Sequence, residues 1–591
     1  MSRALERSAP AASEAVICFG YGAATRRRQP WHAARSLALS LAQAGASTRL
    51  ITDGGVETPD ELFPVLPIGA LRDGPRPGRR LLATLHEHQV GRVWLVIGAH
   101  ELLRPRRLRL GVPTVLVIGS PRLDLRELLR LGWRGLWRER TLLALAVVNA
   151  LLPGWLLRRG FRRSGAVQTL YLSRAAQARW ARLGLPAGRR MAPRVAAAWR
   201  STAVDPEVPV VGYFGPPLRL RGADLALRAF EDACDRGLRA RLELLLRPDG
   251  PDRSMAELLA RVRRSRWRER IDVDTAMLAE EALRARVARW SCFLLPFRVT
   301  VSDAPLVIVE AGLTGRPVLV LDAPGVTEYA RALGGLIARS PAELSEALLY
   351  AATAPRRAPP DPAGWTGPSP PPRFAGGPDP ALWSVCGVDG VGKTRIADAL
   401  AAALEAEGRL TRRFWSRFRN YLSRPLLGLT RLTGHNRKEC AGGTVVGYHD
   451  FAGRPWLAWP FLVLHAADLA LDALLRCRWG RRGATLVADR CLLDGIVDLA
   501  VDTGCERFVI DRLAPWLVRL LPRPWHAVVI ERDPILVGRD RPDALADRNH
   551  HQRRALYRHL ALRLGLPVVR NDGALDTAIA RARAALEDGS R

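Results

Sequence analysis

The stretch GVDGVGKTR, at residues 387–395, constrains this chain more than any other. Two glycines, Gly387 and Gly392, bracket four residues, and Lys393 and Thr394 follow directly, which gives the pattern G-x-x-x-x-G-K-T. Glycine lets a backbone wrap its N–H groups around a phosphate, and a helix that begins there directs its positive end at the anion. An apolar run precedes the pattern and a helical period follows it. The stretch therefore predicts a phosphate-binding loop between a strand and a helix, with an ordinary glycine-rich turn as the alternative.

The lysine of this pattern is one of only two in the chain, the other being Lys438. Because lysine is so scarce, a chance match is on the order of one in a thousand. Lys393 can reach the transferred phosphates, and Thr394 can ligate Mg²⁺. We therefore expect ATP and Mg²⁺ as cofactors. The predicted ATP-binding residues are Gly387, Val388, Asp389, Gly390, Val391, Gly392, Lys393 and Thr394.

The net charge is strongly positive, +32 at pH 7, because 90 Lys and Arg residues outnumber 58 Asp and Glu residues. Such a balance often indicates nucleic acid or an acidic membrane as the partner. Here arginine is spread along the entire sequence, which contains no basic arm, zinc finger or RNP-type motif. We therefore expect anionic small molecules such as nucleotides, or anionic lipid, and no nucleic acid.

The eight cysteines form no C-x-x-C pair and lie mostly in or beside apolar runs, which predicts buried thiols. Residues 1–14 are polar and rich in alanine, without the long apolar segment of a signal peptide. These two features together predict a cytoplasmic protein.

Two apolar stretches raise the question of a membrane. Pro455–Leu475 carries His465 and two aspartates, which favours a buried helix. Thr141–Leu157 is shorter than the ~20 residues of a membrane span and has arginines at both ends. We expect no transmembrane helix. The second stretch either lies peripherally in the inner face of an anionic membrane, with its arginines at the headgroups, or is a packed interior helix.

Apolar β-type runs alternate with helical patterns from residue 15 onwards, and the alternation restarts near residue 208. This order predicts an α/β fold with parallel, doubly wound sheets. The segment 354–380 is rich in Pro and Gly and predicts a linker. We thus expect Rossmann-like domains at 1–195 and 196–353, a linker at 354–381 and a P-loop domain with a parallel sheet at 382–591. The strands expected before the linker are 15–21, 48–52, 92–97, 113–118, 167–172, 208–214, 242–246, 271–273, 292–295 and 317–321.

The first two domains resemble a GT-B glycosyltransferase of the large retaining, family-4-like group that uses sugar nucleotides. The resemblance is carried by GYGAATRRRQPWHAARSLALSLAQAGASTRLITD, by VVGYFGPPLRLRGADLALRAF and by SDAPLVIVEAGLTGRPVLVLDAPGVTEYA. It implies two Rossmann-like halves in the GT-B arrangement. It also implies a sugar-nucleotide site formed by Gly20, Gly22, Arg221 and Glu310.

Two positions depart from the pattern of that family. Pro216 stands where the family has an arginine, and Ser302 stands where it has the first glutamate of a pair. Arg221 occupies the position of the family's lysine and can hold phosphate as a fork. Glu310 can accept hydrogen bonds from the hydroxyls of a ribose, or it can cap a helix. A non-catalytic binding or membrane-docking module is therefore the alternative for this half of the chain.

The last domain resembles the thymidylate kinase branch of the nucleoside-monophosphate kinases. Asp389-Gly390 in the loop and the stretch FLVLHAADLALDALLRCRWGRRGATLVADR carry the resemblance. Asp489 and Arg490 follow the apolar run Thr485–Ala488, and ligands bind at the carboxyl ends of strands in a doubly wound sheet. The resemblance implies that Asp389 faces the acceptor, Asp489 holds Mg²⁺ and Arg490 clamps the acceptor phosphate. A surface ion pair is the alternative for the last two residues.

The charged stretch Asp540–Tyr557 resembles the lid of that branch, with Arg548 placed to stabilise charge on the transferring phosphoryl group. FWSRFRNYLS replaces a family element and offers Arg417 as a phosphate contact. Aspartates at 494, 498 and 502 recur every four residues and share one helical face, which requires cations or hydroxyls opposite it.

The resemblance implies the reaction ATP + nucleoside monophosphate (dTMP by resemblance) → ADP + nucleoside diphosphate, fused to a sugar-nucleotide-dependent transferase. Another phosphorylated acceptor is the alternative. The kinase branch is often dimeric, and the oligomeric state stays open. The predicted catalytic residues are Lys393, Asp489, Arg490 and Arg548, the acceptor-binding residues are Asp389, Arg417, Arg490 and Asp494, and the metal ligands are Thr394 and Asp489.

Overall fold

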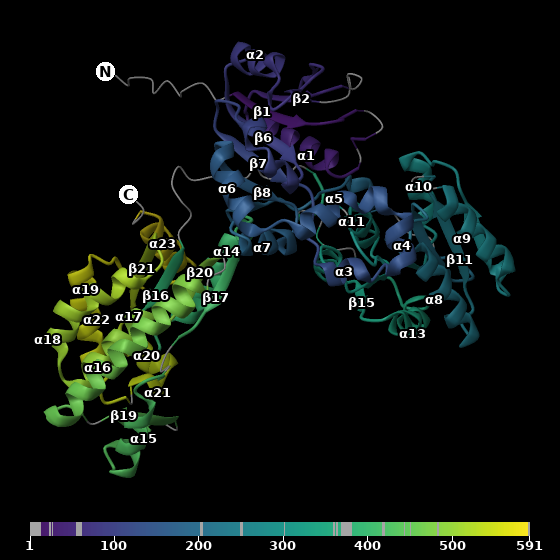
Figure 1. The fold of residues 1–591 in the computed structure, drawn as a ribbon. Helices are drawn as coiled ribbons and strands as arrows, with labels where there is room; N and C mark the ends of the chain where they lie inside the picture. The colour runs from purple at the N-terminus through teal and green to yellow at the C-terminus, as the bar shows by residue number, and fades with distance from the viewer. Residues whose placement is uncertain are drawn as a thin grey trace, which may run out of the picture. The chain divides into compact units, whose positions relative to one another are not determined.

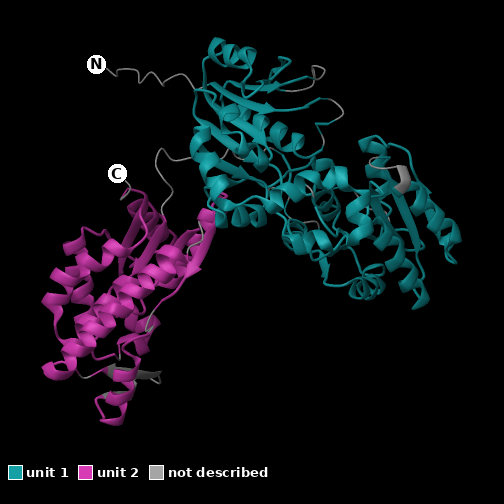
Figure 2. Cartoon of the chain, viewed as in Figure 1, with its two compact units in different colours: residues 1–372 teal, residues 373–591 magenta. Residues whose placement is uncertain are grey.

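The computed structural model divides the chain into two compact units, residues 1–372 and residues 373–591 (Figure 2). Both units are α/β folds built on parallel sheets (Figure 1). The residues that the structure describes are 13–22, 25–26, 28–54, 62–200, 205–248, 252–300, 302–358, 361, 364–367, 381–416, 420–441, 444–449, 451–480, 484–545 and 547–588.

The first half of unit 1 is a parallel sheet with the strand order β3-β2-β1-β6-β7-β8-β9. Its central strands are largely apolar, as in TVLVI at 114–118, because helices cover both faces of a parallel sheet. The strands are β1 (Ser13–Cys18), β2 (Thr48–Thr52), β3 (Val65–Pro67), β6 (Val90–Ile97), β7 (Thr114–Ile118), β8 (Ala166–Tyr171) and β9 (Arg189–Arg190). The helices are α1 (Trp31–Gln43), α2 (Arg79–Glu87), α3 (Leu125–Leu129), α4 (Gly132–Arg138), α5 (Arg140–Leu151), α6 (Gly154–Ser164) and α7 (Arg174–Arg182).

The second half of unit 1 is a parallel sheet with the order β12-β11-β10-β13-β14-β15. The strands predicted before the linker are confirmed in both halves, with ends that shift by at most three residues. The strands are β10 (Val210–Gly215), β11 (Arg241–Leu246), β12 (Ile271–Asp274), β13 (Cys292–Leu295), β14 (Val318–Leu321) and β15 (Leu336–Ala338). The helices are α8 (Ala223–Asp235), α9 (Asp252–Arg264), α10 (Glu280–Val287), α11 (Leu306–Leu313), α12 (Val326–Ala332) and α13 (Pro341–Ala351).

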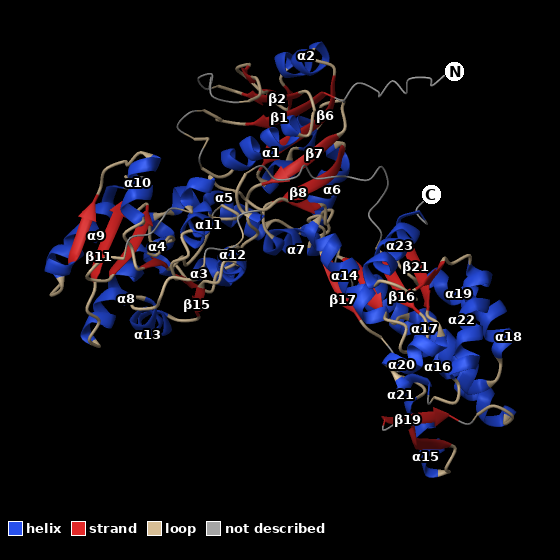
Figure 3. Ribbon diagram, turned by 180° about the vertical axis from the view of Figure 1, so that it is seen from behind, coloured by secondary structure: helices blue, strands red, loops and turns tan. Residues whose placement is uncertain are grey.

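Unit 2 is a parallel sheet with the order β17-β20-β16-β21-β22, and its helices lie on both faces (Figure 3). The strands are β16 (Leu382–Cys386), β17 (Thr411–Phe414), β20 (Thr485–Asp489), β21 (Trp525–Glu531) and β22 (Val568–Arg570). The helices used below are α14 (Lys393–Ala406), α16 (Pro455–Asp472), α17 (Leu492–Thr503), α20 (Pro534–Asp540), α21 (Pro542–Leu545) and α22 (His550–Leu564). The antiparallel pair β18 (Asn436–Ala441) and β19 (Thr444–His449) was not expected.

Parts of the segment predicted as a linker, 354–381, make contacts with unit 1. The backbone N–H of Val195 donates to the carbonyl of Trp365 at 2.9 Å, and Arg357 N–H donates to Gly315 at 3.0 Å. The Trp365 ring also packs edge-on to Tyr329, with 6.1 Å between centroids. Parts of the proline-rich stretch are therefore packed onto unit 1, because an aromatic side chain anchors them there. Residues 368–380 lie outside the described part of the chain.

The two apolar stretches take different forms. Residues 141–157 are not one helix, because the chain bends by 94° between α5 and α6 around Pro153. By length and hydropathy alone, this bent pair taken together and the helix Pro455–Trp479 could each cross a membrane. The second carries buried residues such as Phe461 and Leu462 in the core of unit 2, as expected of a packed helix. The cysteines whose side chains are described are free thiols, buried except for the partly exposed Cys505.

Candidate functional site

The loop at 387–394 connects β16 to α14, and three of its glycines have positive φ. A Cβ on Gly387 would lie 2.4 Å from the carbonyl oxygen of Ile530, and one on Gly392 would lie 2.7 Å from the amide nitrogen of Asn571. Asn571 Nδ2 in turn donates to the carbonyl of Val391 at 2.8 Å. Only glycine can adopt these backbone angles and fit the available space. The loop geometry therefore explains why the sequence pattern has glycine at these two positions.

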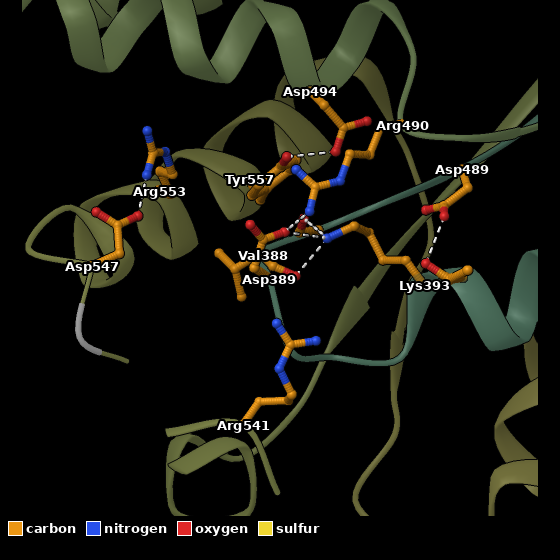
Figure 4. A network of polar contacts seen from close by, with 12 residues as sticks. Val388, Asp389, Lys393, Asp489, Arg490, Asp494, Arg541, Asp547, Arg553 and Tyr557 are labelled. Atoms are coloured by element: carbon orange, nitrogen blue, oxygen red, sulfur yellow. Dashed lines mark hydrogen bonds and ion pairs between the residues drawn. The ribbon is translucent and has the colours of Figure 1, made fainter. Parts of the chain in front are cut away.

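Lys393 begins α14, and its side chain is turned into the loop (Figure 4). Its Nζ donates to the carbonyl oxygens of Gly387 and Val388, both at 2.7 Å, and lies 3.3 Å from Asp389 Oδ1. The side chain is buried. The ammonium group therefore lies inside the ring of backbone that the sequence predicted as a phosphate cradle, where it can exchange these carbonyls for phosphate oxygens.

Thr394 and Asp489 meet beside this loop. The Thr394 hydroxyl donates to Asp489 Oδ2 at 2.6 Å. The other carboxylate oxygen, Oδ1, is buried and has no hydrogen-bond partner among the described residues. Hydroxyl and carboxylate oxygens are the ligands that Mg²⁺ prefers, and Mg²⁺ usually keeps several waters beside one or two protein ligands. The two residues thus fit the metal role that the sequence predicted.

Arg490 follows Asp489 at the end of β20 with φ at +70°, a left-handed angle that is rare outside glycine. Its guanidinium pairs with Asp389 of the loop. Lys393 contacts the same carboxylate, so Asp389 bridges two cations (Figure 4). The alternative was an ion pair between Asp489 and Arg490; in the structure Arg490 instead pairs with Asp389, and Asp489 accepts from Thr394.

The aspartate face predicted on α17 is opposed by a hydroxyl and a cation. The Tyr557 hydroxyl donates to Asp494 Oδ1 at 2.7 Å, and Arg553 Nε donates to Asp498 at 3.1 Å. Asp494 Oδ2 accepts from the backbone of Cys491 at 3.0 Å. Burial raises the pKa of Asp494 to about 6, although Lys393 and Tyr557 oppose that shift. Asp494 therefore anchors the start of α17, and its two oxygens are already engaged.

The segment expected to form a lid packs against the loop. A Cβ on Gly390 would lie 2.7 Å from Val537 of α20 and 3.3 Å from Ala544 of α21. Arg541, between those helices, directs its guanidinium towards the loop (Figure 4). Arg553 joins Asp498 to Asp547. Nothing in the sequence distinguishes Arg541 or Arg553 from the other arginines of this segment.

Of the predicted arginines Arg548 and Arg417, the structure describes only Arg548. Arg548 is exposed, between α21 and α22. Arg417 lies outside the described residues. In this segment the arginine directed at the loop is Arg541, which the sequence of Asp540–Tyr557 does not single out.

A small pocket of about 30 Å³ lies beside Cys491, between α16 and α17. Its wall carries carboxylates, and the described lining residues contain neither lysine nor arginine. Among them is His465, which is buried and whose Nδ1 has no partner in the described part of the chain. The polar lining residues are Ser416, Asn420, His449, His465, Asp472, Asp498 and Asp502.

Unit 1 has a larger cleft of about 800 Å³, lined by residues from both of its halves. Arg221 and Glu310, both predicted for sugar-nucleotide binding, line it, and so do Pro216 and Ser302. Gly20 and Gly22 do not line it; they belong to the loop after β1, where Gly20 N–H donates to Asp53 at 2.7 Å. The structure therefore brings two of the four predicted residues together.

Charged side chains face one another across this cleft. Burial and the neighbouring Glu280 carboxylate raise the pKa of Glu310 to about 7, while Arg247 and Arg221 lower it. The Arg221 guanidinium lies over the Phe297 ring, 4.8 Å from its centroid. Arg247 and Glu280 were missed from the sequence, since neither lies in a segment that resembles the family.

Arg221 lies directly before α8, whose N-cap is Gly222. Gly222 has a φ of +79°, and a Cβ there would overlap the carbonyl of Pro296. The N-terminus of a helix favours an anion, and the adjacent guanidinium adds a full positive charge. Glu310 is the fifth residue of α11, whose N-cap is Pro305, so it does not cap that helix.

One family of known proteins matches a part of unit 1. Residues 206–353 match the family model of glycosyl transferases group 1. None of the curated proteins matches the sequence.

Several solved structures are similar to part of this chain. HepE from Anabaena in complex with UDP-glucose is 13% identical, with a TM-score of 0.40, and the match covers 57% of this chain and 88% of that one. A glycosyltransferase from Rickettsia africae is 9% identical, with a TM-score of 0.41 and coverage of 57% and 87%. Sucrose-phosphate synthase from Thermosynechococcus elongatus is 15% identical, with a TM-score of 0.41 and coverage of 57% and 88%.

Proposed function

We propose that the chain joins two transferases: unit 1 transfers a glycosyl group from a sugar nucleotide, and unit 2 transfers a phosphoryl group from ATP. The match of residues 206–353 to the family of glycosyl transferases group 1 supports the first activity. The contacts of Lys393 and Thr394 in the loop at 387–394 support the second.

The observation that carries the glycosyl-transfer proposal is the charge arrangement in the cleft of unit 1. Arg221 and Arg247 line it together with Glu310, next to the N-terminus of α8. A sugar nucleotide carries a diphosphate flanked by two groups rich in hydroxyls. The arginines would bind the diphosphate and stabilise the charge that develops on it as the glycosyl bond breaks. Glu310 would accept hydrogen bonds from hydroxyls.

Calorimetric titration of the full chain with UDP-, GDP- and dTDP-sugars tests this proposal. We expect one of them to bind, and Arg221→Ala to weaken that binding at least tenfold, because a charge-assisted bond to phosphate is lost. Arg228→Ala is the matched control, since Arg228 is an exposed arginine on α8. Absence of binding for every donor would remove the basis of the proposal.

The phosphoryl-transfer proposal for unit 2 rests on the buried, cationic interior of the loop at 387–394. Lys393 would hold phosphate oxygens in place of the two loop carbonyls that it contacts here. Thr394 and Asp489 would hold Mg²⁺, which neutralises phosphate charge when bound. Arg490 and Arg541 flank the loop and would close over the phosphates. Such catalysis works by positioning the reactants and stabilising charge. ATP as the donor agrees with the cytoplasmic location expected from the sequence.

Unit 2 has two candidate acceptors for the phosphoryl group. The resemblance to thymidylate kinases favours dTMP. The alternative is another phosphorylated acceptor, and the carboxylate-lined pocket beside Cys491 would suit a single hydrogen-bond-donating group of it, such as a hydroxyl or an amine. The phosphoryl group would then be delivered at the mouth of the pocket beside Cys491, near Asp489 and Arg490.

Phosphoryl transfer by the full chain from radiolabelled ATP tests both statements. Lys393→Ala should reduce turnover of any acceptor at least a hundredfold with the melting temperature retained. Arg395→Ala is the control, because Arg395 is exposed two residues further along α14. Turnover that survives Lys393→Ala refutes the mechanism. A screen of dTMP, other nucleoside monophosphates, polyols and amino sugars decides the acceptor.

A further inference from the structure

Four consecutive helices of unit 1, α3 to α6, expose large apolar side chains. Trp133 is 79% exposed, Trp137 61% and Trp155 56%. Soluble proteins seldom expose many large apolar side chains in one region unless the region binds something. We name these side chains the α3–α6 surface: Leu125, Leu129, Trp133, Trp137, Leu142, Leu145, Val148, Leu151 and Trp155.

The inner side of the same helices already has its partners. Leu128, Leu131 and Leu143 pack with Leu218 and Leu220 of the second half of unit 1. The α3–α6 surface is the other side, and the core of unit 1 does not use it. It is therefore not explained by packing within the unit.

Helix α5 shows the anomaly most clearly. A helix on a protein surface normally directs polar residues outwards. Here the exposed positions after Arg140 are Thr141 followed by alanine, leucine and valine. The polar residue Asn149 points inwards and donates to Ser120 at 3.2 Å. Exposing an apolar face to water is unfavourable by about 25 cal/mol per Å², so this face is suited to an apolar environment.

Positive charge surrounds the apolar side chains. The two acidic residues between 125 and 164 are buried and engaged: Glu127 with Arg179 at 2.6 Å, and Glu139 with the backbone N–H groups of Arg219 and Leu220. The exposed charge of this segment is therefore entirely positive. Its arginines are Arg126, Arg130, Arg134, Arg138, Arg140, Arg158, Arg159, Arg162 and Arg163.

Several of these guanidinium groups are available to an anion. Within the described part of the chain, the side chains of Arg126, Arg134, Arg159, Arg162 and Arg163 have no acidic partner. Arg140 lies over the Trp137 ring, 4.7 Å from its centroid. Tryptophan and arginine side by side suit the headgroup region of a bilayer, where the indole is half-buried and the cation meets phosphate.

We infer that the α3–α6 surface docks unit 1 onto an anionic lipid bilayer. The leucine and tryptophan side chains enter the boundary between headgroups and acyl chains, and the arginines bind lipid phosphates. A second copy of the chain is a less suitable partner for the α3–α6 surface, because the arginines of the two copies would face and repel one another. The inference goes beyond the two transferase activities and does not depend on either.

Co-sedimentation of the full chain with vesicles tests the inference. We expect binding to vesicles of equal parts phosphatidylglycerol and phosphatidylcholine, little binding to phosphatidylcholine alone, and weaker binding as NaCl rises. The triple variant Trp133→Ala, Trp137→Ala, Trp155→Ala should lower the partition coefficient at least tenfold. The double variant Arg159→Glu, Arg162→Glu should do the same.

Two matched controls come from the same unit. Tyr350→Ala removes an aromatic ring that is 65% exposed on α13, and Arg236→Glu with Arg239→Glu reverses two exposed arginines after α8. Both should bind anionic vesicles as the unchanged protein does, and all variants should keep its melting temperature. Equal partition of the triple variant and the unchanged protein overturns the inference, as does equal binding to both vesicle types. A dimer in sedimentation velocity that the triple variant abolishes would overturn it in favour of a second copy.

Discussion

The Thr394 hydroxyl donates to Asp489 Oδ2 at 2.6 Å, which joins the first turn of α14 to the end of β20. The two residues are far apart in sequence, and adjacent parallel strands bring them together: β16 leads into the loop before Thr394, and β20 pairs with β16. The other Asp489 oxygen remains buried without a described partner. This contact is the structural basis for expecting a divalent cation in unit 2.

A first prediction concerns that cation. Thr394→Val removes the hydroxyl but keeps the shape, so the Mg²⁺ concentration for half-maximal phosphoryl transfer should rise about tenfold or more. Titration of activity with MgCl₂ measures this. Thr394→Ser keeps the hydroxyl and should restore the original dependence. An unchanged midpoint in Thr394→Val would show that the hydroxyl has no part in metal binding.

A second prediction concerns the buried Asp494 on α17. Burial raises its pKa to about 6 from an ordinary value of 3.8. The protonated form is therefore favoured in the folded state, and the stability it contributes is present below pH 4 and lost as the pH rises through 6. Asp494→Asn should flatten the pH dependence of unfolding between pH 4 and 7, as followed by urea titration.

The hydrogen bond from Tyr557 to Asp494 allows a companion test. Tyr557→Phe leaves a buried carboxylate without its hydroxyl donor, so the free energy of unfolding should fall by about 1–3 kcal/mol at pH 8. Because that bond lowers the pKa of Asp494, its loss should also move the pH-dependent region upwards. A larger loss at pH 5 than at pH 8 would contradict the assignment.

A third prediction concerns Glu310 in the cleft of unit 1, whose pKa is raised to about 7. An ionised carboxylate accepts hydrogen bonds from hydroxyls more strongly than a neutral one. The affinity for the sugar nucleotide should therefore rise between pH 6 and 8, and Glu310→Gln should make it independent of pH. Calorimetric titration at several pH values measures this. Affinity that falls over that range would reverse the proposed role.

A fourth prediction concerns the contact between the two halves of unit 1. Asp303 Oδ1 accepts from the Ser173 hydroxyl at 2.5 Å, and Oδ2 accepts from the Ser173 N–H at 2.9 Å. Burial raises the pKa of Asp303 to about 7. The stability it contributes is therefore present below pH 4 and lost as the pH rises through 7.

Scanning calorimetry of the full chain tests this contact. The transition of unit 1 should shift to lower temperature by several degrees between pH 5 and 8. Asp303→Asn should reduce that shift, whereas Ser173→Ala should enlarge it, because the serine hydroxyl lowers the pKa of Asp303. A shift that stays the same in both variants would place its origin elsewhere.

Features that depend on residues close together in the sequence could be predicted from the sequence. Apolar runs of four to eight residues between helical patterns predicted the parallel sheets, because strands covered on both faces must be apolar throughout. The loop at 387–394 was predictable because its glycines are required by backbone angles and close contacts. The face with Asp494 and Asp498 was predicted to need hydroxyls or cations, and Tyr557 and Arg553 supply them.

The edge and surface elements were not predictable in the same way. Strand β17 reads TRRF and carries two exposed arginines, since an edge strand needs no apolar alternation on its open side. The segment 364–367 reads as linker but packs onto unit 1 through Trp365. In such places a single tertiary contact outweighs local composition.

The sequence alone determined which residues form the loop that we propose for phosphate binding, because that geometry depends on glycines and a lysine within eight consecutive positions. Only the tertiary structure decided which arginines accompany them. Arginine occurs throughout this chain, so its pattern carries little information. Packing of α20 and α21 on Gly390 directs Arg541 to the loop, and the folding of the second half of unit 1 brings Arg247 into the same cleft as Glu310. A charge acts over a few ångströms, and those distances are set by how distant segments fold together.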